Sequence, residues 1–74
     1  MKKSQGAYGN LKAELSKKDI TYKEVAISLG LHRNAVERKI KGESKFSVEE
    51  AMHIQEKFFS DISISYLFRR DQTA

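Results

Sequence analysis

The sequence predicts an all-α protein, a bundle of five short helices. Apolar residues recur three or four positions apart in several segments, and residues that cap helices precede most of these segments. The chain contains no proline, and no stretch alternates apolar and polar residues over the length of a strand. Because 74 residues provide one small hydrophobic core, we expect a single domain.

The most informative stretch, residues 21–42, has the spacing of two helices joined by a tight turn. Thr21 and Glu24 form the signature of a capping box, in which each side chain accepts a hydrogen bond from a backbone N–H group of the other residue. A helix should therefore begin there, and its inner face carries Val25, Ala26 and Leu29. Gly30 follows at once, and glycine adopts the left-handed conformation that ends a helix and turns the chain.

A second helix is expected over residues 32–41. Val36 and Ile40 lie one turn apart on its inner side, and Gly42 supplies another stop. The outer side is polar and basic and carries Arg33, Asn34, Glu37, Arg38 and Lys41. Two helices joined in this way form a helix-turn-helix, the unit with which many proteins place a helix in the major groove of DNA.

Several residues of this stretch match a known family. They are Ala26 in the first helix, Leu29, Gly30 and Leu31 at the turn, Val36 four positions past the second cap, and the Arg-Lys-Ile-Lys-Gly sequence at 38–42. In these residues the chain resembles the phage Cro and repressor family, also called lambda-repressor-like or XRE-type, and the likeness extends over residues 10–68. It departs from the family at Tyr22, where Gln is common, at His32, where Ser or Thr is common, and at Lys39, which is often apolar.

The resemblance implies a five-helix lambda-repressor-like bundle that contains the helix-turn-helix. It also implies a sequence-specific DNA-binding transcriptional regulator, a Cro-like repressor of phage or prokaryotic type that occupies an operator.

The flanking segments supply the other three helices. Asn10 is expected to cap a helix over residues 11–18, with Leu11 and Leu15 facing inward. A second capping box, Ser47 with Glu50, should begin a helix over residues 48–59, and Ser63 a last one over residues 64–68. The residues expected to face the core from these two helices are Ala51, Met52, Ile54, Phe58 and Leu67.

The two ends of the chain lack an apolar period. We expect residues 1–9, which carry Lys2 and Lys3, to form a flexible basic arm, residues 10–68 to form the DNA-binding domain, and residues 69–74 to form a frayed tail. The arm is either a plain tail or a segment that reaches the DNA backbone or minor groove.

Candidate DNA contacts divide into base readers and phosphate binders. The base-reading set is His32, Arg33, Asn34, Glu37 and Arg38, and the phosphate-binding set is Thr21, Tyr22, Lys23, Lys41, Ser44 and Lys45. Two of these residues have an alternative, purely structural role. Glu37 lies at helical spacing from Arg33 and Lys41 and would pair with one of them, and the ring of Tyr22 would pack on Leu31 or Val36.

One domain of this size covers few base pairs, so we expect a homodimer on a two-fold operator. The interface candidates are Phe59, Ile62, Tyr66 and Phe68, which alternatively complete the core of the monomer.

Composition and motifs argue against other functions. The chain has no Cys, no glycine-rich phosphate loop and no serine elbow. Glu50 and His53 have the spacing of a metal-binding Glu-x-x-His motif, but the sequence contains no second such motif. We therefore expect no enzyme activity, metal, cofactor or small-molecule ligand. No apolar run is long enough for a membrane span, and we expect a cytoplasmic, nucleoid-associated protein. The net charge of +4 suits a polyanionic partner. The rival interpretation is a protein-interaction module, such as an antitoxin or anti-repressor, built on the same fold.

Overall fold

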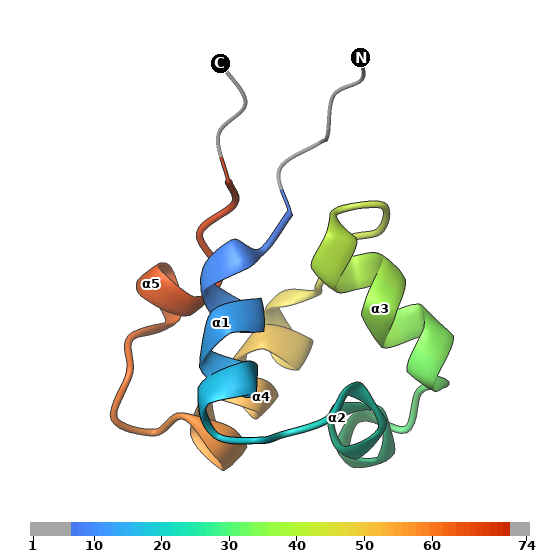
Figure 1. Ribbon diagram of the computed structural model, residues 1–74, viewed down its shortest axis with the longest axis horizontal. Coiled ribbons are helices and arrows are strands. Elements are labelled where there is room, and N and C mark those ends of the chain that lie inside the picture. Colours follow the sequence, from blue (N-terminus) through green and yellow to red (C-terminus); the bar gives the residue numbers. More distant parts are fainter. Residues whose placement is uncertain (1–6, 72–74) are drawn as a thin grey trace.

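The computed structural model describes residues 7–71, and within that range the chain forms five helices and no strand. The helices are α1 (Gly9–Lys17), α2 (Tyr22–Leu29), α3 (Arg33–Lys41), α4 (Val48–Phe58) and α5 (Ile64–Leu67) (Figure 1). In the described part of the chain, no helix is both long and apolar enough to cross a membrane.

The expected helix starts are confirmed for three helices. Both capping boxes are formed, one by Thr21 with Glu24 and one by Ser47 with Glu50, and the side chain of Ser63 caps α5. The prediction that Asn10 caps α1 is wrong, because α1 begins at Gly9 and has no side-chain cap. The Asn10 amide instead donates a 2.9 Å hydrogen bond to the backbone carbonyl of Tyr66, which ties α1 to α5.

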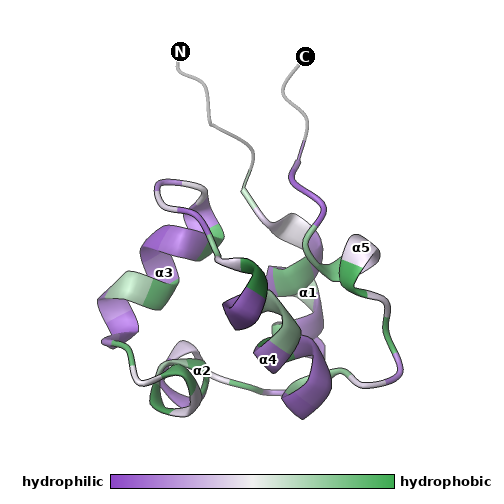
Figure 2. Cartoon of the chain, turned by 180° about the vertical axis from the view of Figure 1, so that it is seen from behind, coloured by the Kyte–Doolittle hydropathy of each residue, from purple (hydrophilic) through white to green (hydrophobic). Residues whose placement is uncertain are grey.

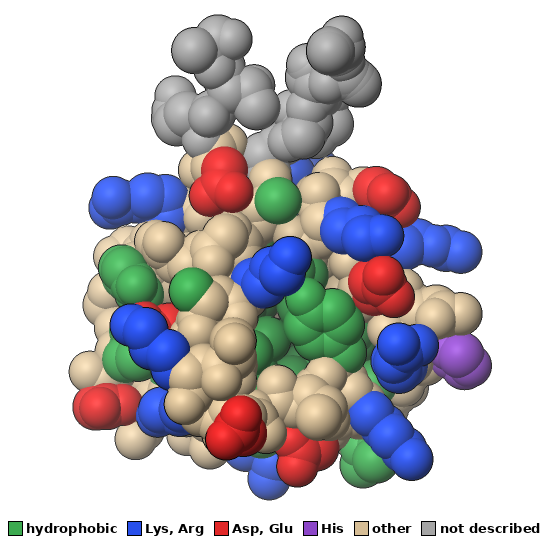
Figure 3. Space-filling view, in the orientation of Figure 1, with side chains coloured by type: hydrophobic (Ala, Val, Ile, Leu, Met, Phe, Trp, Pro, Cys, Tyr) green, Lys and Arg blue, Asp and Glu red, His purple; other side chains and the backbone are tan. Residues whose placement is uncertain are grey.

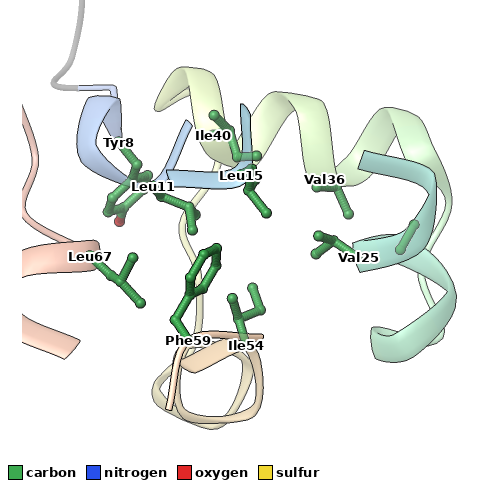
Figure 4. Close-up of a cluster of buried hydrophobic side chains, with 10 residues drawn as sticks. Tyr8, Leu11, Leu15, Val25, Val36, Ile40, Ile54, Phe59 and Leu67 are labelled. Carbon is green, nitrogen blue, oxygen red and sulfur yellow. The ribbon is translucent and has the colours of Figure 1, made fainter. Parts of the chain in front are cut away.

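The core is a single cluster shared by all five helices (Figure 4). Its hydrophobic members are Tyr8, Leu11, Leu15, Val25, Ala26, Val36, Ile40, Ile54, Phe59 and Leu67. Figure 4 shows Val25 and Val36 pointing toward each other, so that they join α2 to α3. Met52, expected in the core, is 45% exposed, because α4 turns Ile54 inward and packs Phe58 at the edge of the cluster.

Both helices of the central pair end at a glycine in the left-handed conformation. Gly30 has φ +71° and Gly42 has φ +89°. After α2, the Leu31 N–H donates to the carbonyl of Ala26 at 2.9 Å, and after α3 the Glu43 N–H donates in the same way to Arg38 at 2.9 Å. These bonds satisfy carbonyls that have no partner within the helix, as in the Schellman motif.

The predicted boundaries of the two chain ends are wrong where the structure describes them. Tyr8 is only 7% exposed and belongs to the core, and the Asp71 N–H donates a 2.8 Å hydrogen bond to the Ala7 carbonyl. The ordered domain therefore extends beyond residues 10–68, because an aromatic side chain anchors the N-terminal segment. Lys2 and Lys3 of the predicted arm lie outside the described residues.

Candidate nucleic-acid interface

The outer face of α3 is exposed and polar, whereas its inner face holds the buried pair Val36 and Ile40. Arg33, Asn34 and Arg38 are exposed, and their side chains form no hydrogen bond or ion pair with the described residues. Figure 2 shows this helix as mostly hydrophilic, with a short hydrophobic band. These three side chains are available to a ligand without first losing a protein partner.

His32 acts as the N-cap of α3 rather than as a fully free side chain. Its Nδ1 atom accepts a 3.2 Å hydrogen bond from the backbone N–H of Asn34. An imidazole that accepts at Nδ1 carries its proton on Nε2, so this residue replaces the usual hydroxyl cap and can still donate outward.

Glu37 is paired along the helix. Its carboxylate lies 3.2 Å from the Lys41 ammonium, which is the i,i+4 alternative. An open depression of about 260 Å³ is lined by Asn34, Glu37, Arg38 and Lys41, together with Glu43. The structure thus brings four predicted DNA-contact residues together and adds an acidic neighbour.

The start of α2 presents backbone donors. The Thr21 N–H donates to the Glu24 carboxylate at 2.8 Å, and the Thr21 hydroxyl accepts from the Glu24 N–H at 3.1 Å, so Thr21 serves the capping box. The N–H groups of Tyr22 and Lys23 follow in the first turn, where a helix has no carbonyl to offer them. Lys23 is exposed, and its ammonium has no partner among residues 7–71.

The Tyr22 ring packs against the core cluster and lines a cavity of about 400 Å³ beside α3. Other residues around this cavity are Tyr8, Lys12, Glu37, Ile40 and Lys41. Figure 3 shows hydrophobic side chains at the bottom of a hollow on this face, with charged side chains around it. Burial, followed by the Glu37 carboxylate, raises the pKa of the Tyr22 phenol from its ordinary value, and the Lys41 ammonium opposes both effects.

Lys39 fixes the loop that follows α3, a role that sequence reasoning missed. Its ammonium donates to the backbone carbonyl of Lys45 at 2.8 Å and lies 3.3 Å from the Glu50 carboxylate. The same ammonium sits over the Phe46 ring, 5.8 Å from the ring centroid. The sequence did hold a signal for this role, because position 39 is a lysine here and is often apolar in the resembled family. Its contacts hold the backbone that carries the exposed Ser44 and Lys45.

Three of the four predicted dimer-interface residues belong to the monomer. Phe59 is fully buried, so its assignment to an interface is wrong, and Ile62 and Phe68 pack against the core. Tyr66 is 37% exposed, and its hydroxyl donates a 3.0 Å hydrogen bond to the Glu14 carboxylate. The large C-terminal side chains Phe59, Ile62 and Phe68 thus complete the core of this small domain.

Glu50 and His53 do not form part of a metal cluster. The Glu50 carboxylate accepts from the Ser47 N–H at 2.9 Å and pairs with Lys39. Among the residues that the structure describes, no three His, Cys, Asp or Glu side chains are grouped to hold a metal ion.

Comparison with known proteins adds no assignment, since no family model, curated protein or solved structure matches the chain significantly.

The electrostatics around Tyr22 predict a pH dependence. Changing Glu37→Gln should lower the pKa of Tyr22, because the negative neighbour is lost and Lys41 remains. A spectrophotometric titration of phenolate absorbance measures this pKa, and Tyr22→Phe identifies which part of the signal belongs to Tyr22.

The pKa of Tyr22 is raised in the folded state, so the stability contributed by protonated Tyr22 is present below the unfolded pKa and is lost as pH rises through the folded value. As pH rises into the alkaline range, Tyr22→Phe should therefore lose less stability than the unmodified protein does. An unchanged or higher Tyr22 pKa in Glu37→Gln would contradict the assigned effect of the Glu37 charge.

Proposed function

We propose that the protein is a sequence-specific DNA-binding regulator that uses α2 and α3 as a helix-turn-helix of the Cro and repressor kind. The proposal rests chiefly on one observation. Asn34 and Arg38 lie on the exposed side of α3 and line the same depression, while the opposite side of the helix is buried. A helix held in this way can enter the major groove without a change in the bundle.

The free side chains of α3 match the donor and acceptor groups of base edges. Arg33 and Arg38 each offer a guanidinium fork, which can bind O6 and N7 of guanine, and Asn34 can bind N6 and N7 of adenine. Glu37 has a lesser role in this proposal, because its carboxylate is engaged by Lys41.

Phosphate contacts come from the two sides of α3. At the start of α2, the N–H groups of Tyr22 and Lys23 lie at the positive end of the helix dipole, and the Lys23 ammonium adds a charge. On the other side, Ser44 and Lys45 lie on the loop that Lys39 holds in place. These contacts set the position of α3 on the duplex and carry no sequence information.

We further propose that two copies bind a two-fold operator and repress by blocking polymerase. Half-sites one helical turn apart would separate the two α3 helices by about 34 Å. Of the four residues first assigned to the dimer interface, Tyr66 is the one that remains at the surface.

The rival function is a protein-interaction module such as an antitoxin or anti-repressor. It is favoured by large apolar side chains at the surface, since Ile27 is 70% exposed and Val48 is 75% exposed. A protein partner would cover such residues, whereas DNA binding through α3 does not require them.

Salt dependence separates the two functions. Mobility shifts with random duplex DNA should show affinity that falls steeply as salt rises, and Lys45→Ala should reduce the slope of log K against log salt by about one unit. Lys57→Ala removes the same charge from α4 and should leave the slope unchanged. Absent or salt-insensitive binding would favour the protein-interaction module.

Base reading is tested on a site selected from a random DNA pool, which we expect to be palindromic. Replacing Asn34→Ala and Arg38→Ala together should abolish preference for that site, at about 1 to 3 kcal/mol for each lost bidentate contact, and should spare weak nonspecific binding. Competition binding against random DNA measures the preference. An unchanged ratio of specific to nonspecific affinity would remove both residues from the reading face.

A further inference from the structure

The two described chain ends lie together at the C-terminal end of α3. We call residues 7–8 and 69–71 the terminal strap. Its two segments run beside each other (Figure 1) and are joined by the 2.8 Å hydrogen bond from the Asp71 N–H to the Ala7 carbonyl. Neither segment belongs to a helix, so their order comes from contacts with the rest of the chain.

Each segment of the strap donates a hydrogen bond to the last turn of α3 or to the glycine after it. The Tyr8 N–H donates to the Ile40 carbonyl at 2.9 Å, and the Arg70 guanidinium donates to the Gly42 carbonyl at 3.3 Å. Carbonyls at this end of a helix have no intrahelical donor, so these bonds supply partners that α3 cannot supply itself.

The strap also packs against the loop that follows α3. The Tyr8 ring meets Phe46 edge to face at a centroid distance of 5.3 Å, and Phe68 completes the group at 5.8 Å from Tyr8 and 5.2 Å from Phe46. The Arg70 guanidinium lies over the Tyr8 ring at 5.0 Å. Such contacts favour one relative arrangement of the rings and the cation. Phe46 directly follows Lys45, so this packing fixes one end of the loop with the phosphate-binding candidates.

We propose that the terminal strap positions the C-terminal end of α3 and the loop after it for DNA binding. This inference rests on the proposed function and assigns Tyr8 and Arg70 as positioning residues that act through α3. Because α3 buries only two side chains, its last turn frays readily without the strap. Arg38 and Lys45 would then have to be ordered at the moment of binding, which weakens affinity.

The turn after α2 provides an internal reference. It has the same glycine geometry and the same pattern of hydrogen bonds as the turn after α3, but the strap hydrogen bonds to helix-end carbonyls given above reach the end of α3 and not the end of α2. An effect of the strap should therefore appear at Gly42 and Glu43, whereas a general loss of stability should appear equally at Gly30 and Leu31.

Arg70→Ala tests the proposal in the full chain, because it removes strap contacts and leaves the buried core cluster intact. Amide hydrogen exchange by NMR should accelerate roughly tenfold at Gly42 and Glu43 relative to Gly30 and Leu31, as expected for loss of a hydrogen bond to a charged donor. Arg69→Ala, which removes the same charge from an exposed neighbour, is the matched control and should leave the ratio unchanged. Equal acceleration at both turns, or none at α3, would overturn the proposal.

DNA affinity provides the second readout. Arg70→Ala should weaken binding to a selected duplex several-fold more than Arg69→Ala does, and equal losses would overturn the positioning role in DNA binding. If the exchange rates change as expected but the unmodified protein binds no DNA, the proposed function fails while the hold of the strap on α3 stands.

Discussion

The placement of α3 depends on a narrow apolar contact, since Val36 and Ile40 are its only buried residues. A nine-residue helix is not stable alone in water, and two buried side chains leave it free to pivot unless both ends are fixed. The left-handed turn at Gly30 fixes the start. Lys39, through the following loop, and the terminal strap fix the end. Because only Val36 and Ile40 are buried, most of the helix surface stays available for binding.

The charged residues of α3 divide by their partners. Glu37 pairs with Lys41, and Lys39 pairs with Glu50, so each of these charges is compensated within the protein. Arg33 and Arg38 have no such partner among the described residues. A cation that is exposed and unpaired loses little on meeting a base edge or a phosphate, whereas a paired one must first give up its neighbour. The unpaired arginines therefore carry the proposed recognition.

Local features were predictable from the sequence, and long-range ones were not. The capping boxes at Thr21 and Ser47 and the left-handed turn at Gly30 depend on residues within a few positions of one another, so spacing alone located them. The burial of Tyr8 depends on Phe46 and Phe68, far along the chain, and a single aromatic residue in a polar segment gives no period to detect.

The candidate site follows the same division. The exposed outer side of α3 was predictable, because the spacing of Val36 and Ile40 sets which side is buried. The use of His32 as a cap was not predictable, since histidine is an uncommon N-cap and its role depends on a side-chain rotamer.

The most direct test of the account is NMR chemical-shift mapping during titration with a selected duplex. The account predicts the largest shifts in α3, at the start of α2 and at residues 44–45. Shifts confined to α4 and α5, or none at saturating DNA, would contradict it.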